Sequence, residues 1–357
     1  MSFIEGSLSA ASASRSRLSA TESLFPLVAA AIPDLTEFWI EGGLPEDLPP
    51  RYLFSLARLK RLEKLNTIYS GAVVDHEALQ CISHMTALRN VELRICLDGI
   101  GPSDSLQLGE AFDGLTNIHI SGSIHDIRRL ANDEGPEGLA RRGVRQVSKS
   151  ISEAHIYVSA HIDSPDISLG DVLQPYLPFR EMASMEMEFD HHIPCWNDED
   201  MLAFANAWPL LKSFFWSCGV PDPLPLPLPS QPTVAGVVEL ARRCPRLEYL
   251  TLPLLDVRTL PRPRDVPPVG HKSMQSLDVG RYIGGETANL LDLAVILDVL
   301  FPRLKRQRCC IRAKDGVSLE NTDADCLPVR MTDLLLRRFR HAENCSTEPQ
   351  RRTHLAH

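Results

Sequence analysis

Apolar residues recur along the chain in short segments of the form L-x-x-φ-x-φ, where φ is an apolar residue. Successive segments begin 26 to 36 residues apart. They begin at Leu35, Leu62, Leu88, Leu115, Ile151, Met182, Leu211, Leu247, Met274 and Leu304, and the segments at Leu62 and Leu304 are degraded. A leucine-rich repeat has this core and a period of about 20–29 residues. The longer steps indicate insertions on one side of such an array.

The spacing within a segment also sets the orientation of its side chains. The fourth and sixth positions point to one face of a short strand, and the third and fifth positions point to the other. The sequence therefore predicts one curved array of parallel strands. We expect them at about Phe38–Ile40, Val91–Leu93, Ile118–Ile120, Met185–Met187, Leu250–Leu252 and Leu277–Val279.

Helix-like stretches precede most of these strands, at Leu24–Ile32, His76–His84, Asp198–Trp208, Thr233–Cys244 and Thr287–Phe301. In four of them a proline, Pro33, Pro209, Pro245 or Pro302, lies two residues before the repeat residue. Proline disfavours helix and should end it there. Stacking such helix–strand units would bury a continuous core. The fold class predicted is α/β, a leucine-rich-repeat solenoid whose curved parallel sheet carries helices on its convex side; the alternative is an ordinary α/β domain.

The expected organisation has four parts. Residues 1–22 form a disordered leader, 23–312 the solenoid, 313–344 a C-terminal cap and 345–357 a disordered tail. Two proline-rich segments, 220–232 and 259–268, follow strands, so we expect stiff loops at one edge of the array. The first could instead be a ligand for an aromatic groove.

Composition narrows the class of function. The chain has 357 residues, with 37 basic and 46 acidic side chains and a net charge of -9. That balance argues against nucleic acid as a partner. No apolar run approaches the ~18 residues that cross a bilayer, so we expect no membrane partner. Nine cysteines without a CxxC motif, and no secretory signal, indicate the cytoplasm or nucleus.

Motifs of catalysis and metal binding are few. The sequence contains no GxSxG, GxGxxG, P-loop or HExxH motif. His191, His192 and Cys195 lie close together in FDHHIPCW, but no second ligand pair follows at zinc-site spacing. We therefore predict no metal, no cofactor and no enzymatic activity. An α/β enzyme with a site assembled from distant residues is the alternative.

Several segments carry a resemblance to a known family. They are YSGAVVDHEALQCISHMTALRNVEL, DEDMLAFANAWPLLKSF, LARRCPRLEYLTLPLLDVRTLPRP, SMQSLDVGRYIGG and VILDVLFPRL. Together, over roughly Arg51 to Arg308, they resemble the repeats of F-box/leucine-rich-repeat proteins of mushroom-forming fungi. The resemblance implies a protein-recognition role like that of the substrate-binding repeats of ubiquitin-ligase receptors. In that family an N-terminal F-box docks on the Skp adaptor.

The N-terminal part departs from that family pattern. No F-box-like Leu-Pro-x-Glu-(Ile/Leu) opening is present, and the first repeat begins by Leu24. We therefore expect the chain alone not to bind the Skp adaptor. A stand-alone scaffold or a truncated inactive product is the alternative to a ligase receptor.

The third and fifth strand positions supply the candidate binding surface. We expect them to face a protein ligand on the concave face, because inner faces of solenoids commonly bind partners. Aromatic residues suit binding hot spots, and carboxylates select a basic ligand. The candidate partner-binding residues are Trp39, Glu153, His155, Tyr157, Glu186, Phe215 and Tyr249.

Overall fold

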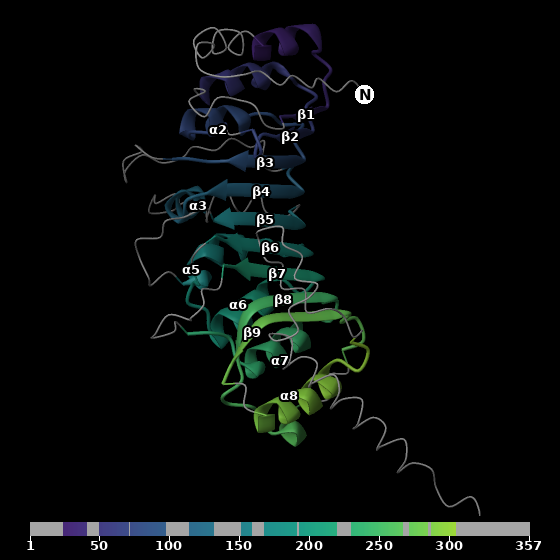
Figure 1. The fold of residues 1–357 in the computed structure, drawn as a ribbon. Helices are drawn as coiled ribbons and strands as arrows, with labels where there is room; N and C mark the ends of the chain where they lie inside the picture. Colours follow the sequence, from purple (N-terminus) through teal and green to yellow (C-terminus); the bar gives the residue numbers. More distant parts are fainter. Residues whose placement is uncertain are drawn as a thin grey trace, which may run out of the picture. The chain divides into compact units, whose positions relative to one another are not determined.

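The computed structural model describes residues 24–40, 50–70, 72–97, 114–131, 151–158, 168–190, 193–219, 230–266, 271–284 and 287–304. Within these ranges most strands are preceded by a helical segment (Figure 1). The chain divides into two compact units. Unit 1 comprises Met1–Pro194 with Cys218–Pro227, and unit 2 comprises Cys195–Ser217 with Leu228–His357.

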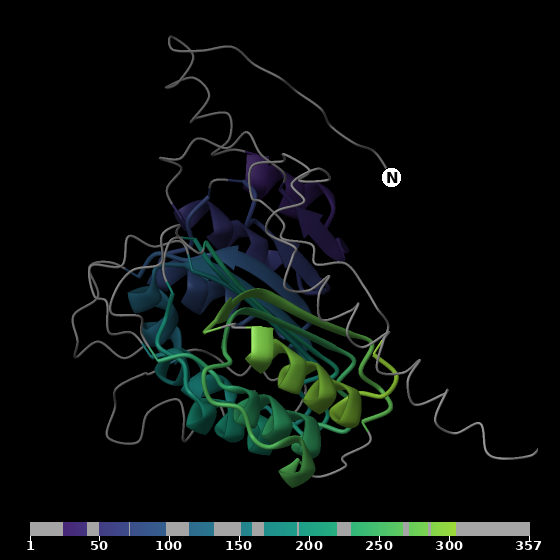
Figure 2. The same cartoon turned by 60° about the horizontal axis from the view of Figure 1, so that its bottom comes forward.

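Unit 1 is built on a parallel sheet in which each strand pairs with the next strand along the chain. Its strands are β1 (Glu37–Trp39), β2 (Lys64–Asn66), β3 (Asn90–Arg94), β4 (Asn117–Gly122), β5 (Glu153–Val158) and β6 (Ser184–Phe189). Its helical segments are residues 24–31, η1 (Pro50–Arg58), α2 (His76–Ile82), α3 (Ile124–Ala131), α5 (Leu169–Leu173) and η3 (Gln174–Tyr176). The α-helices α2, α3 and α5 lie along one face of this sheet (Figures 1 and 2).

Unit 2 repeats the same arrangement with longer strands and helices. Its strands β7 (Ser213–Cys218), β8 (Tyr249–Asp256) and β9 (Ser276–Ile283) pair in parallel, in chain order. Its helical segments are α6 (Asp198–Ala207), α7 (Val234–Arg243), η4 (Pro263–Asp265) and α8 (Thr287–Leu300). Parallel strands in chain order, all but β4 preceded by a helical segment among the described residues, make each unit a leucine-rich-repeat solenoid.

The register of the repeat is confirmed in both units. Every predicted strand overlaps an observed one, and the observed strands begin at the third position of the repeat, one residue earlier than predicted. Most of the fourth and sixth positions are buried, as the alternation requires, while Phe38, Ile118 and Leu277 are half-buried. In β6, for example, Met185 and Met187 are fully buried, and in β8 so is Leu250.

A tight turn follows most of the helical segments. At the four prolines, the N–H of the repeat leucine donates to the carbonyl of the residue before the proline. These residues are Ile32, Trp208, Cys244 and Phe301, with N–O distances of 3.0–3.2 Å. Proline fits the second position of such a turn because its φ is preset. The helices accordingly end two residues before it, at position 31 and at Ala207, Arg243 and Leu300.

The same turn forms where proline is absent. Leu62, Leu88 and Met182 donate in the same way to Leu59, Met85 and Phe179, at 3.0–3.3 Å. In these three turns the accepting residue is buried and apolar. An apolar side chain three residues before the repeat residue thus anchors each of these three turns in the core, whereas Ile32, before Pro33, is exposed.

Acidic residues tie neighbouring repeats together on the helix side. In unit 1, Asp126 of α3 accepts a hydrogen bond from the N–H of Leu97 at 2.7 Å. In unit 2, Asp198 of α6 accepts from the N–H of Thr233 at 2.8 Å and from its hydroxyl at 2.6 Å. Thr233 is the N-cap of α7, so one carboxylate fixes where the next helix begins.

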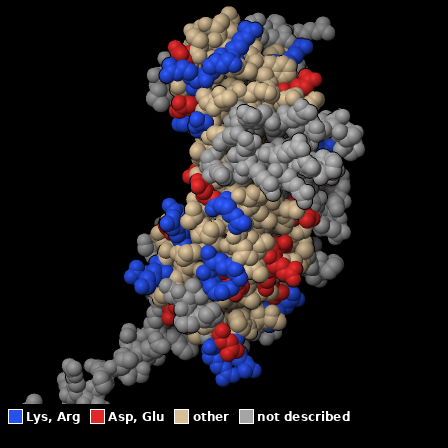
Figure 3. All heavy atoms as spheres, turned by 180° about the vertical axis from the view of Figure 1, so that it is seen from behind, with Lys and Arg blue, Asp and Glu red and all other residues tan. Residues whose placement is uncertain are grey.

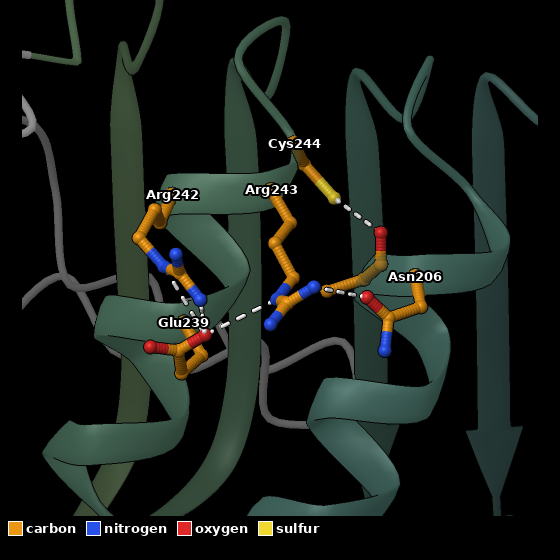
Figure 4. Close-up of polar contacts among 6 residues, drawn as sticks. Asn206, Glu239, Arg242, Arg243 and Cys244 are labelled. Carbon is orange, nitrogen blue, oxygen red and sulfur yellow. Dashed lines mark hydrogen bonds and ion pairs between the residues drawn. The ribbon is translucent and has the colours of Figure 1, made fainter.

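Polar side chains also join α6 to α7 at their C-terminal ends. Arg243 donates to Glu239 of its own helix and to Asn206 of α6, while Arg242 pairs with Glu239 at 2.6 Å (Figure 4). The thiol of Cys244 lies 3.9 Å from the carbonyl of Ala205. The ion pairs are partly exposed, so each contributes on the order of 0.2–1 kcal/mol.

Several sequence expectations differ from the structure or lie outside it. The helical segments η1, α3 and α5 were not expected from the sequence. The predicted leader, C-terminal cap and tail lie outside the described residues, as do most of the loop 220–232, positions 267–268 of the second loop, and His191 and His192.

Candidate functional site

The register of unit 1 arranges the outward-facing side chains in rows that cross the strands. One row contains the third position of each repeat and the next row the fifth, as the paired residues show. We call this strand surface, opposite the helices, the open face of unit 1. The first row is Glu37, Lys64, Asn90, Asn117, Glu153 and Ser184. The second row is Trp39, Asn66, Glu92, His119, His155 and Glu186.

The centre of the second row is a carboxylate–imidazole–imidazole–carboxylate series, which we call the Glu-His ladder. The rings of His119 and His155 stack with centroids 3.9 Å apart and an angle of 20° between their planes. Nδ1 of His119 lies 3.8 Å from Oε2 of Glu92, and Nδ1 of His155 lies 3.9 Å from Oε2 of Glu186. Each imidazole therefore has one carboxylate beside it and the other imidazole across from it.

Amide side chains hold two of the carboxylates of this surface in place. Asn66 donates to Oε2 of Glu92 at 2.6 Å, and Asn117 donates to Oε2 of Glu153 at the same distance. Both bonds run between strands rather than along one strand. The geometry of the site is thus built into the strand pairing and needs no loop to form it.

A hollow with a volume of about 190 Å³ lies over this part of the sheet. It extends from β3 to β6 and includes the whole Glu-His ladder. The remaining lining residues are Asn90, Asn117, Ile118, Glu153, Ala154 and Ser184. The hollow is therefore lined mostly by polar groups, with three carboxylates and no Lys or Arg among them.

Burial shifts the titration of two ladder residues. Burial, helped by the nearby imidazole of His155, lowers the pKa of His119 from 6.5 to about 4. Burial likewise raises the pKa of the Glu92 carboxyl above its usual range. The side chains of His119 and Glu92 are only 15% and 23% exposed, so water stabilises their charged forms poorly. At neutral pH His119 is neutral, and the carboxylates dominate the potential of the hollow.

The ladder does not have the geometry of a metal centre. Within the described ranges, no three His, Cys, Asp or Glu side chains converge as metal ligands would. The five cysteines in those ranges are free thiols, and burial raises the pKa of Cys218 and of Cys244 to about 12. Thiols with such pKa values are poor nucleophiles and poor metal ligands. The groups that line the hollow can form hydrogen bonds and attract positive charge.

Three of the sequence-predicted site residues meet in the hollow. Glu153, His155 and Glu186 all line it. Tyr157 follows on β5 in the next row, half-buried, and its hydroxyl donates to Asp190 at 2.5 Å. Trp39 lies in the same row as the ladder, on β1, and is 54% exposed.

The other two predicted residues belong to unit 2. Phe215 is on β7 and is partly exposed, with buried Phe214 and Trp216 on either side of it. Tyr249 begins β8, is 45% exposed, and its hydroxyl lies 3.3 Å from Gln275 Oε1. Both occupy outward positions of their strands, as expected from the repeat. Their role in binding stays a prediction.

Sequence reasoning placed Glu92 and His119 on the outward face but did not select them for the site. Their strands, in NVEL and NIHI, give no local signal that distinguishes them from other polar positions. The signal lies in the repeat alignment, because the fifth positions of four successive repeats read Glu92, His119, His155 and Glu186. Comparing these positions across repeats would have found the ladder.

Charges elsewhere on the surface are mixed. On the face in Figure 3, Lys and Arg side chains of the described residues are interspersed with Asp and Glu. No helix among the described residues is long and apolar enough to cross a membrane.

No protein-family model matches the sequence, and no curated protein matches it. Solved structures with some similarity include an internalin (inlF) from Listeria monocytogenes, at 11% identity and a TM-score of 0.34, covering 78% of this chain and 79% of that one. The LRIM1/APL1C complex has 9% identity and a TM-score of 0.31, covering 93% of this chain and 68% of that one. The Rad7 and Elc1 complex in yeast has 10% identity and a TM-score of 0.23, covering 81% of this chain and 87% of that one. Likenesses this weak say nothing about what the present chain binds.

Proposed function

We propose that the chain is a non-catalytic protein-recognition module whose partner docks on the open face of unit 1. The observation that carries the proposal is the Glu-His ladder, a preorganised polar hollow on a rigid parallel sheet. Fixed polar groups lose little entropy on binding, which favours specific recognition. The exposed Trp39 in the same row adds aromatic contact area of the kind found at binding hot spots.

The finer form of the proposal concerns the biological role. The repeats would hold a protein in the way that the substrate-binding repeats of F-box ubiquitin-ligase receptors do. The resemblance of the segments between Arg51 and Arg308 supports this role. A pull-down probed for the Skp adaptor and a cullin tests it. Because we expect the chain alone not to bind the Skp adaptor, recovery of a cullin would support the role, and recovery of neither protein would favour a stand-alone scaffold.

The binding proposal is tested with partners captured by a photo-cross-linking residue. One variant carries the residue at position 186, on the open face, and a matched variant carries it at position 77, on the exposed side of α2. A captured protein is then titrated calorimetrically against the full chain and two variants, His155→Ala and His76→Ala. His76 is an exposed histidine of α2, on the helix side of the same unit.

The expected results separate the two faces. His155→Ala should weaken binding about tenfold, the loss typical of a central interface residue. His76→Ala should leave the affinity unchanged. Equal affinities for all three proteins, with each folded by circular dichroism, would place the partner elsewhere.

A second candidate is acid–base catalysis in the hollow. The lowered pKa of His119 favours it, because perturbed pKa values are common at catalytic groups. Ser184 also lines the hollow, but in the part of the chain described, no hydrogen bond joins its hydroxyl to either imidazole. A screen of esterase and phosphatase substrates on the full chain and on His119→Asn tests this candidate. Catalysis requires that the full chain turns over a substrate and that His119→Asn does not.

A further inference from the structure

The spacing of the carboxylates on the open face carries information about the partner. Glu92 on β3 and Glu186 on β6 lie in one row and are separated by three strand spacings. Neighbouring strands are about 4.8 Å apart, so the backbone positions of the two residues are about 14 Å apart. Between them lie only the two stacked imidazoles.

An extended peptide lying across the strands has a matching repeat. It advances about 3.4 Å per residue, so residues i and i+4 are about 14 Å apart. Residues i, i+2 and i+4 also point to the same side of an extended chain. A peptide over the ladder would therefore present residue i to Glu92, residue i+4 to Glu186, and residue i+2 to the ring edges of His119 and His155.

The charges of the hollow define the chemistry of residues i and i+4. Both end groups are carboxylates, and a third, Glu153, lies in the adjacent row beside them. The nearest cation in the two rows, Lys64, is already paired with Glu37 at 2.9 Å. Guanidinium groups bind carboxylates through two parallel hydrogen bonds, so arginine suits both positions.

We propose that the Glu-His ladder binds an extended basic segment of the partner protein, with arginine side chains four residues apart on Glu92 and Glu186. This inference rests on the proposed function, since it names the part of the partner that docks on the open face. The two carboxylates set the spacing. The imidazole pair, uncharged at the His119 end, leaves room for a small side chain at the position between them.

The test uses synthetic fluorescent peptides and the full chain. The probe contains Arg-Ser-Ala-Ser-Arg within a Gly-Ser flank, and a second peptide moves the arginines to a three-residue spacing as Arg-Ser-Ala-Arg. Fluorescence anisotropy should give at least fivefold tighter binding for the four-residue spacing. Glu92→Gln should weaken that binding about tenfold and the more exposed Glu186→Gln about threefold.

A matched variant controls for loss of net charge. Glu77→Gln removes one exposed carboxylate from α2, on the helix side of the same unit, and should leave peptide affinity unchanged. Binding that ignores the spacing, or that falls equally in Glu77→Gln, would overturn the inference. So would failure of the four-residue peptide to bind at all. If a captured partner then still binds more weakly to His155→Ala than to the full chain, the proposed function stands and only the arginine spacing is excluded.

Discussion

At the scale of single residues, burial and register explain both the stability and the site. Leu250 occupies the fourth position of its repeat and is fully buried, as the sequence predicted. The same alternation turns His119 and Glu92 toward the hollow, where partial burial shifts the pKa of each toward its uncharged form. One pattern of positions thus places the core and the candidate site on opposite faces of the strands.

Replacing Leu250 by alanine should destabilise the protein by about 2–5 kcal/mol, because a buried leucine leaves a cavity behind. Leu210 offers a matched control, since it belongs to the same unit and is 37% exposed. Leu210→Ala should cost less than about 1 kcal/mol. Urea unfolding followed by circular dichroism measures both changes, and equal losses would show that the strand register is wrong.

His119 should make the protein less stable in mild acid. Its pKa of about 4 in the folded chain lies below the ordinary value of 6.5, so the unfolded chain binds this proton more readily. The contribution of His119 to the free energy of unfolding is therefore fully present above pH 6.5 and is lost as the pH falls toward 4. Relative to His119→Asn, the protein should lose on the order of 2–3 kcal/mol over that window.

The comparison with His119→Asn cancels the groups common to both proteins. The remaining difference in stability comes from His119 and from its interactions with Glu92 and His155, the titratable neighbours on the adjacent strands. Urea midpoints at pH 6.5 and at pH 4 give the difference directly. A variant whose stability follows that of the parent chain across this range would contradict the lowered pKa.

At the scale of elements, close contact between α6 and α7 depends on a glycine. A Cβ atom on Gly236 would lie 2.7 Å from the sulfur of Met201 and closer still to a carboxylate oxygen of Asp198. Asp198 cannot move freely, because it holds the N-cap of α7. The absence of a side chain at Gly236 therefore lets the two helices pack.

Gly236→Ala should destabilise the protein despite the higher helix propensity of alanine. Alanine favours a helix by about 1 kcal/mol over glycine, while overpacking costs about 1–3 kcal/mol. The net change should be a loss, measured as a lower melting temperature. A higher melting temperature would mean that α6 and α7 are further apart than described here.

The longest helices, α6, α7 and α8, were predictable from the sequence, whereas η1, α3 and α5 were not. The prolines predicted the last residues of α6, α7 and α8 to within one residue, because a proline lacks the N–H that a helix needs and so ends it close to its own position. The helix α5 spans only five residues, too few for a period to emerge. Of the Glu-His ladder, His155 and Glu186 were predicted as site residues but Glu92 and His119 were not, since the members are up to 94 positions apart and meet only through strand pairing.

At the scale of the whole molecule, the formal charge of -9 and the carboxylates of the open face act in the same direction. Both attract a basic partner and speed its encounter. Affinity should fall as salt rises from 50 to 300 mM, because exposed charges are screened over about 8 Å at physiological ionic strength. Surface plasmon resonance with a captured partner measures this, and a salt-independent affinity would indicate an apolar interface.

The central claim is that a partner covers the open face of unit 1, and carboxyl footprinting tests it most directly. The full chain, alone and with a captured partner, is labelled with a carbodiimide and an amine, and each carboxylate is quantified by mass spectrometry. Labelling of Glu153 and Glu186 should fall several-fold on binding, while that of Glu77 on α2 stays constant. Unchanged labelling at Glu153 and Glu186, with protection at Glu77, would contradict the account.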